Sequence, residues 1–156
     1  MTVRPYKPPD LDQIITVHGA SVHALAAPLY TAEQLAAWAP SNPDVGLWRH
    51  RLAAFHTIVA EHDGVIAGFA SYELNGHLDM LYTHPAFARR GVATSLYCHV
   101  ESALCAAGVS RVLTEASLAA RHFFEHCGFQ IDAEEFVECR GFQLPRYAMH
   151  KDLRAV

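Results

Sequence analysis

Two arginines and a glycine stand directly before a predicted helix in the segment HPAFARRGVATSL, residues 84–96. A helix N-terminus has up to four unpaired N–H groups and a positive partial charge, so it binds anions such as phosphate. Gly91 opens the backbone to a ligand, and Arg89 and Arg90 would add charge-assisted hydrogen bonds. The segment therefore predicts a diphosphate-binding loop, although it contains neither GxxxxGKS/T nor the GxGxxG fingerprint of other phosphate loops.

The segment HFFEH, residues 122–126, indicates a different chemistry. Its spacing matches H-x-x-E-H and places His122, Glu125 and His126 on one helical face, as in a family of zinc peptidases. A five-residue pattern arises easily by chance in a chain with 11 histidines, and the predicted helix ends at Gly128. We keep the zinc peptidase as an alternative function and expect no metal.

Two helices are predicted ahead of the first strand. Asp10 and Gln13 have capping-box spacing at the start of the first helix, and Thr31 and Gln34 repeat that signal before a second helix that Pro40 ends. The segment LWRHRLAAF reads as a helical turn. From residue 56 the pattern becomes strand-like, with turns at HDG and NG that predict an antiparallel meander of three strands.

The second half of the chain predicts two helices and three strands. Apolar residues at helical spacing follow Gly91 and end at Gly108, RVLTEA reads as a strand, and the helix containing HFFEH ends before two last strands. The predicted order is α-α-β-β-β-α-β-α-β-β. This order is an α/β fold with a mixed, mostly antiparallel sheet flanked by helices and a single βαβ crossover.

Length and composition set limits on the function. The chain has 156 residues, of which 51% are hydrophobic and 18% charged, and its net charge is -4. These values predict one folded domain, residues 1–156, that does not bind nucleic acid. The absence of a signal-like or membrane-spanning run predicts a cytoplasmic protein with no membrane partner. The four cysteines form no CxxC pair, so we expect reduced thiols.

Two segments resemble motifs of the GNAT superfamily, the acyl-CoA-dependent N-acyltransferases. LYTHPAFARRGVATSL is similar to its central motif, Q/R-x-x-G-x-G/A after a strand, with Gly91 and Ala93 on the last two specified positions. SLAARHFFEHCGF resembles its second motif, with Ala120, Phe123, Gly128 and Phe129 matching. The resemblance covers residues 56–151, the expected acetyl-CoA-binding core, and leaves residues 1–55 as a helical acceptor-side region. Tyr30–Trp38 and Arg140–Met149 are similar to segments of bacterial members.

The resemblance implies an N-acetyltransferase that moves an acetyl group from acetyl-CoA, as co-substrate, to an amine by direct attack in a ternary complex. The acceptor would be a small-molecule amine or a peptide. Backbone groups of one strand would pair with the pantetheine arm, and the loop and helix start would hold the pyrophosphate. The cofactor-binding residues implied are Leu81, Tyr82, Thr83, Arg89, Arg90, Gly91, Val92, Ala93, Thr94, Ser95, Ser117, Ala120, Phe123 and Phe124.

Three positions depart from the family's motifs. Ala88 stands where an Arg or Gln often opens the phosphate motif, and Ser117 stands for a frequent Asn. Phe124 replaces the tyrosine that often protonates the leaving thiolate, and a phenyl ring cannot donate a proton. Either Tyr147 or Tyr82 donates instead, or the thiolate, with a pKa of about 8.5, leaves with help from water.

The acceptor amine needs a base because a group with a pKa of about 10.4 is mostly protonated at neutral pH. The glutamate that the family often places on the pantetheine-binding strand falls on His77, and Asp79, two residues on, should share its face. Asp79 and His77 are the main candidates, and Glu73 is a third. A two-residue NG turn would pair Glu73 with Leu78 and point it to the other face, unless a bulge shifts the register.

The helical region of residues 1–55 should form the acceptor side of the cleft. The expected substrate-binding residues are Tyr30, Trp38, Trp48 and Tyr147, although aromatic residues at helical spacing are also typical of an ordinary core. A non-catalytic domain that senses acyl-CoA remains an alternative function. Separately, the C-terminal strands of two chains could pair to form a homodimer.

Overall fold

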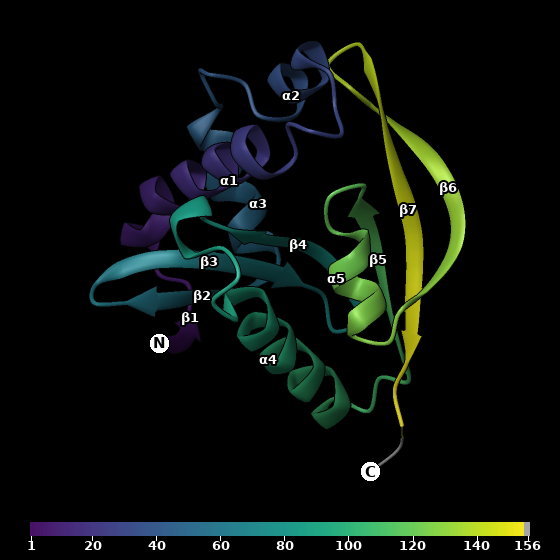
Figure 1. The fold of residues 1–156 in the computed structure, drawn as a ribbon. Helices are drawn as coiled ribbons and strands as arrows, with labels where there is room; N and C mark the ends of the chain where they lie inside the picture. Colours follow the sequence, from purple (N-terminus) through teal and green to yellow (C-terminus); the bar gives the residue numbers. More distant parts are fainter. Residues whose placement is uncertain (155–156) are drawn as a thin grey trace.

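A single seven-stranded sheet organises the computed structural model, which describes residues 1–154 (Figure 1). The strand order is β1-β2-β3-β4-β5-β7-β6, and every neighbouring pair is antiparallel except β4 and β5. The strands are β1 (Thr2–Pro5), β2 (His56–His62), β3 (Val65–Tyr72), β4 (His77–Thr83), β5 (Arg111–Ser117), β6 (Gln130–Cys139) and β7 (Phe142–Asp152). The helices are α1 (Leu11–Leu25), α2 (Ala32–Trp38), α3 (Val45–Ala54), α4 (Val92–Ala106) and α5 (Arg121–His126), with short 3-10 turns at Pro8–Asp10 and Pro85–Phe87.

The predicted fold class is confirmed, with two corrections to the element order. β1 precedes the helices and pairs with β2, so residues 1–55 are not purely helical. Four residues ending in a proline are too short for a period-2 pattern to identify a strand, and only the pairing with β2 reveals it. The segment read as a helical turn is the ten-residue helix α3, which begins where Asp44 accepts a hydrogen bond from the Leu47 N–H.

The two expected N-terminal caps differ in outcome. Thr31 and Gln34 form the predicted capping box, with bonds of 3.1 and 2.9 Å between each side chain and the other residue's N–H. The box at Asp10 is wrong, because Arg4 holds that carboxylate at 2.8 and 3.0 Å. Gln13 instead accepts a hydrogen bond from β3. A partly buried ion pair has therefore replaced a cap that local spacing alone would favour.

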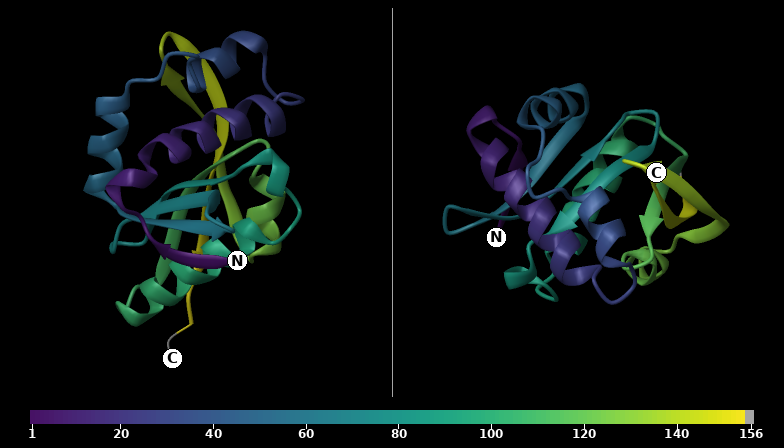
Figure 2. Two further views of the ribbon diagram at one scale, coloured as in Figure 1. Left: turned by 90° about the vertical axis from the view of Figure 1, so that its left-hand side faces the viewer. Right: turned by 90° about the horizontal axis from the view of Figure 1, so that it is seen from above.

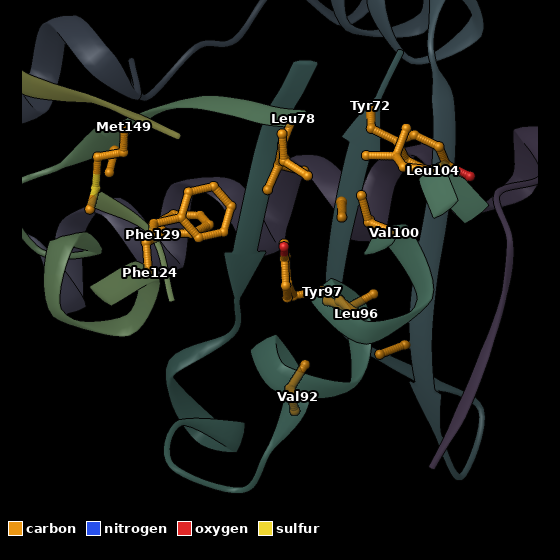
Figure 3. Packing of buried hydrophobic residues seen from close by; sticks show 14 of the residues in the cluster. Tyr72, Leu78, Val92, Leu96, Tyr97, Val100, Leu104, Phe124, Phe129 and Met149 are labelled. Carbon is orange, nitrogen blue, oxygen red and sulfur yellow. The ribbon is translucent and has the colours of Figure 1, made fainter. Parts of the chain in front are cut away.

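Helices cover both faces of the sheet (Figures 1 and 2). On one face, α1 and α3 pack on a cluster that contains Phe69 and Met80. On the other, Leu96 and Val100 of α4 meet Leu78 in a second cluster, which continues to the aromatic rings of α5 (Figure 3). No helix within residues 1–154 is long and apolar enough to cross a bilayer. β6 lies at an edge of the sheet, where the pairing of C-terminal strands in a homodimer stays a prediction.

Candidate active site

The parallel strands β4 and β5 separate after a short contact. They pair at two positions only, His77 with Leu113 and Leu78 with Thr114, whose hydroxyl also donates to the Leu78 carbonyl at 3.0 Å. On its other side, β4 stays paired with β3 as far as Thr83. The rest of β4 therefore offers one open edge, to which an extended ligand can pair as an added strand. Leu81, Tyr82 and Thr83, expected to bind pantetheine, lie on this stretch.

The start of α4, next to this edge, is the expected anion-binding end. Gly91 adopts the left-handed conformation, φ 80°, and no side chain of residues 1–154 caps the helix. The first bond of the helix runs from the Ser95 N–H to the Gly91 carbonyl at 2.9 Å, so the preceding N–H groups of Val92, Ala93 and Thr94 have no helical partner. Nothing lies within 4 Å of where a Cβ on Gly91 would stand. These features fit a diphosphate.

The two arginines of this loop are both exposed. Arg89 also has a positive φ, 62°, which is unusual for a residue with a side chain. The Arg90 guanidinium lies over the Phe87 ring, 5.7 Å from its centre. This contact keeps one positive charge close to the helix start, where a phosphate would sit.

A cavity of about 350 Å³ opens on the α1 and α3 side, where β4 and β5 separate. Its walls come from α1, α2, α3, both diverging strands and the β6–β7 hairpin. Tyr30, Trp38 and Trp48, the aromatic residues expected to bind the acceptor, line it together with Tyr82. The side chains of Trp38 and Tyr82 touch, because the indole N–H donates to the phenol oxygen at 3.2 Å.

The β6–β7 hairpin lies beside α2 (Figures 1 and 2), and residues of both line the cavity. The Tyr30 hydroxyl donates to the Pro145 carbonyl at 2.7 Å and accepts from the Leu118 N–H at 2.9 Å. Three further bonds join hairpin and helix: Arg140 Nη1 to the Ala37 carbonyl at 2.7 Å, Cys139 Sγ to the same oxygen at 3.2 Å, and Gln34 Nε2 to the Gln143 carbonyl at 3.0 Å. The Tyr30 ring therefore lines the cavity, while its hydroxyl connects β7 to the segment that follows β5 through these two hydrogen bonds.

His18 of α1 is a wall residue to which the sequence pattern gave no role. It lies between two aromatic rings, with centroids 4.8 Å from Trp48 and 4.7 Å from Tyr82, and it is 8% exposed. Burial lowers its pKa to about 4, and the charges of Arg51 and Arg140 act in the same direction. At neutral pH the imidazole is uncharged, so this wall is aromatic rather than cationic.

A β-bulge turns Asp79 toward the cavity. Ser71 pairs with Met80 but Tyr72 pairs with Leu78, which leaves Asp79 as the extra residue of β4. Arg51 of α3 binds it through Nε at 3.1 Å and Nη2 at 3.0 Å. Both bonds end on Oδ2, so within residues 1–154 Oδ1 keeps its lone pairs for a ligand.

The bulge also shifts the register of the turn, so that Glu73 pairs with His77 through the bond from the Glu73 N–H to the His77 carbonyl. The expected two-residue NG turn is thus wrong, and the alternative with a bulge is correct. His77 Nδ1 lies 3.2 Å from Glu73 Oε2, and its Nε2 lies 2.8 Å from Glu115 Oε1 of β5. The hydrogen bond to Glu115 is the main cause that raises the pKa of His77 to about 9. A protonated imidazole cannot accept the proton of an amine, and this favours Asp79 as the base.

Comparison with known proteins decides the family. The chain matches the acetyltransferase (GNAT) domain over residues 26–151. It is also 32% identical to the uncharacterized N-acetyltransferase YafP of Escherichia coli over 147 residues, which cover 94% of this chain and 93% of YafP. The chain belongs to the GNAT acetyltransferase family.

Solved structures agree with this assignment. The GCN5-related N-acetyltransferase from Rhodopseudomonas palustris is 34% identical, with a TM-score of 0.94 over 97% of this chain and 95% of that one. The PaiA N-acetyltransferase from Thermoplasma acidophilum, solved in complex with coenzyme A, is 17% identical and shares the fold, with a TM-score of 0.77 over 98% and 100% of the two chains. The resemblance inferred from the two motifs is confirmed, and the protein is an acetyl-CoA-dependent acyltransferase.

The second GNAT motif places three of its expected residues at the cavity. Ser117, Ala120 and Phe124 line it. The Ser117 hydroxyl accepts from the Ala120 N–H at 3.2 Å and so fixes the turn before α5. Phe124 is buried against the Phe129 ring, with centroids 5.0 Å apart (Figure 3). Its position is that of a packing residue beside the open edge of β4.

Phe123 and Tyr147 lie elsewhere than the cavity walls. Phe123, on α5, is partly buried and packs against the core cluster under α4. The Tyr147 ring lies under the Arg121 guanidinium, 5.2 Å from its centre. Of the two tyrosines considered as proton donors, only Tyr82 lines the cavity. Burial raises the pKa of Tyr82 to about 12, which makes it a weak acid.

The HFFEH segment forms α5, a helix of six residues. Glu125 is held by the Arg121 Nε at 3.1 Å and by the His122 Nδ1 at 3.4 Å, and both histidines are exposed. No group of three or more His, Cys, Asp or Glu side chains in residues 1–154 has the arrangement of a metal site. The zinc-peptidase alternative therefore receives no support from the geometry.

Proposed function

We propose that this GNAT acetyltransferase transfers the acetyl group of acetyl-CoA to the amine of a small molecule held in the aromatic cavity. The observation that carries the proposal is that the open edge of β4 runs directly into this cavity. An acyl-pantetheine arm paired to that edge, with its pyrophosphate at the start of α4, would present its thioester beside Asp79. The coenzyme A bound to the Thermoplasma acidophilum relative supports acetyl-CoA as the donor.

The shape of the cavity favours a small acceptor over a peptide. Its volume of about 350 Å³ lies at the lower end of the range for small-molecule sites. The hydrogen bonds between the hairpin and α2 close one side of it, whereas a peptide needs a groove that is open along its length. Five aromatic rings and a neutral His18 favour an acceptor with an apolar or aromatic body next to its amine.

Asp79 is the proposed general base. An ammonium with a pKa of about 10.4 loses its proton at neutral pH at a cost of roughly 4–5 kcal/mol, and a positioned carboxylate reduces this barrier. The free amine then attacks the thioester carbon to form a tetrahedral intermediate. As the C–S bond breaks and the thiolate leaves, the nitrogen gives its second proton to water and the amide forms. Because Phe124 cannot donate a proton, the thiolate takes one from water. The sum of the steps is an amide, free coenzyme A and one released proton.

The test is a panel of small amines and of peptides with free N-termini or lysines, each incubated with acetyl-CoA and assayed for thiol release and for acetylated product. We expect turnover with small apolar or aromatic amines and little with peptides. Turnover confined to peptides would contradict the proposed acceptor class. Stabilisation by acetyl-CoA without turnover of any amine would support the sensor alternative instead.

An active amine then allows Asp79→Asn to be compared with Glu138→Gln, a second carboxylate that lines the cavity. Asp79→Asn should lower kcat by about 10²-fold or more because the base is lost, and it should leave the Kd for acetyl-CoA unchanged. Glu138→Gln should stay close to wild type. Equal effects of the two substitutions would mean that Asp79 acts only through the overall charge of the cavity.

A further inference from the structure

Three titratable side chains form a continuous hydrogen-bonded line from the cavity to the surface. Glu115 of β5 lines the cavity, and its Oε1 is 2.8 Å from His77 Nε2. The other ring nitrogen, Nδ1, is 3.2 Å from Glu73 Oε2. Glu73 stands at the β3–β4 turn, outside the cavity, with a side chain that is 40% exposed. One imidazole thus bridges an inner carboxylate and an outer one.

The proposed reaction needs a path by which a proton can leave the cavity. Each acetyl transfer to an ammonium releases one net proton, and this proton starts inside a cavity that helices and a hairpin enclose. Asp79 receives it first, and Asp79 and Glu115 line the same cavity. Water in the cavity can join two carboxylates that do not touch. Asp79 must lose this proton before the next turnover.

The charged side chains around Glu115, His77 and Glu73 favour proton transfer through His77. His77 faces Glu73, Glu115 and Asp79, whereas Arg146 of β7 acts on Glu115 and Arg51 holds Asp79. The hydrogen bond from His77 lowers the pKa of Glu115, so a proton that arrives there is passed on rather than kept. The imidazole is charged at neutral pH, because its pKa is about 9, and it donates through both nitrogens.

We propose that Glu115, His77 and Glu73 carry the proton released by the acceptor amine from the cavity to the surface. Nδ1 of the imidazolium first gives its proton to Glu73, which releases it to solvent, and this leaves a neutral ring with one unprotonated nitrogen. The ring then turns so that this nitrogen faces Glu115, and the proton held by Glu115 moves to it. This step restores the imidazolium, and no other reactant is needed. The proposal rests on the proposed function and adds Glu115 to its residues; His77 is a positioning and relay residue rather than the base.

The experiment uses the full chain, acetyl-CoA and an amine found active in the panel. The variants are His77→Gln, Glu115→Gln and the double variant. His150→Gln serves as the matched control, because His150 also pairs with a carboxylate, Asp132, at 2.7 Å but does not line the cavity. Thermal unfolding checks that each variant is folded. Kinetics are measured at saturating acetyl-CoA, at several pH values, and with and without free imidazole.

We expect His77→Gln and Glu115→Gln each to lower kcat by about tenfold or more, with the KM for acetyl-CoA unchanged. The double variant should lose no more than the worse single one, because both residues serve one path. Added imidazole should restore part of kcat in His77→Gln, since a small diffusing base can replace the relay. The His150→Gln control should behave as wild type.

A folded His77→Gln variant with kcat within about twofold of wild type would overturn the relay, while leaving the proposed function in place. Multiplicative losses in the double variant, or a loss that imidazole does not relieve and that follows weaker acetyl-CoA binding, would also overturn it. Absence of turnover in the wild-type protein with every amine would refute the proposed function itself, and the relay with it.

Discussion

Gly91 offers a sharp test of the anion-binding end because the chain contains a matched control. Gly91 has φ 80° and Gly64, in the β2–β3 turn, has φ 79°. Both are exposed, and at both positions nothing lies within 4 Å of an added Cβ. The proposed substitutions are Gly91→Trp and Gly64→Trp. In the free protein, the two should impose the same backbone strain and no clash.

The size of each effect follows from the backbone geometry. A side chain in the left-handed region costs roughly 1–2 kcal/mol, and in a domain of this size 1 kcal/mol corresponds to a Tm change of about 2–4 °C. Both variants should therefore unfold about 2–8 °C below wild type. Acetyl-CoA at about 100 times its Kd stabilises by about 2.7 kcal/mol, which is a Tm increase of about 5–11 °C. Only the Gly64 variant should keep this increase, because only at Gly91 would the indole occupy the expected phosphate position.

The assay is a thermal-unfolding scan of the three proteins with and without acetyl-CoA. Loss of the ligand-induced increase in Gly91→Trp alone would agree with a pyrophosphate at the start of α4. An equal increase in both variants would refute this reasoning, since the indole would then lie in empty solvent. Loss of the increase in both would show that the strain spreads through the sheet, which the open space around both glycines argues against.

Three further predictions concern stability. Tyr30→Phe removes both hydrogen bonds of a buried hydroxyl and should lower the free energy of unfolding by about 1–3 kcal/mol, measured by denaturant titration. Gly68→Ala places a Cβ 2.7 Å from the Tyr82 carbonyl oxygen of β4 and 2.7 Å from Val92 Cγ1 of α4, and it should cost about 1–3 kcal/mol in the same assay; an unchanged midpoint would mean that both neighbours move away freely. The free energy of unfolding should fall as the pH drops from 6.5 toward about 4, because the unfolded chain protonates His18 in this range and the folded chain does not. His18→Phe should flatten that slope, and a slope equal to that of wild type would contradict the burial argument.

The parts of the fold that the sequence predicted are those decided by neighbouring residues. The capping box at Thr31 depends on a residue three positions away, and the start of α4 depends on the freedom of Gly91 to adopt a positive φ. The motifs that identify the family are of the same local kind. β1 could not be found in this way, because its four residues are a strand only when β2 is beside them.

The candidate site was harder to predict because its side chains meet across elements. Glu115 is a single charged residue in a strand pattern, and such a residue normally faces solvent. Only the two-position contact between β4 and β5 brings it to His77. Arg51 reaches Asp79 across 28 positions of the chain, and no spacing rule covers that distance. His18 and Arg140 line the cavity for the same reason, and sequence periodicity carries no signal for them.

The bulge at Asp79 affects both the packing of β4 and the position of the candidate base. Side chains of a regular strand alternate, so residues 78 and 80 would face the same side. In this protein, Leu78 packs in the cluster under α4 and Met80 packs in the cluster under α1, on opposite faces. The extra residue between them explains how side chains two positions apart come to face opposite sides. Because neither core takes the extra residue, Asp79 can be the carboxylate that meets Arg51 at the cavity, and the bulge thus places a polar group where β4 leaves β5.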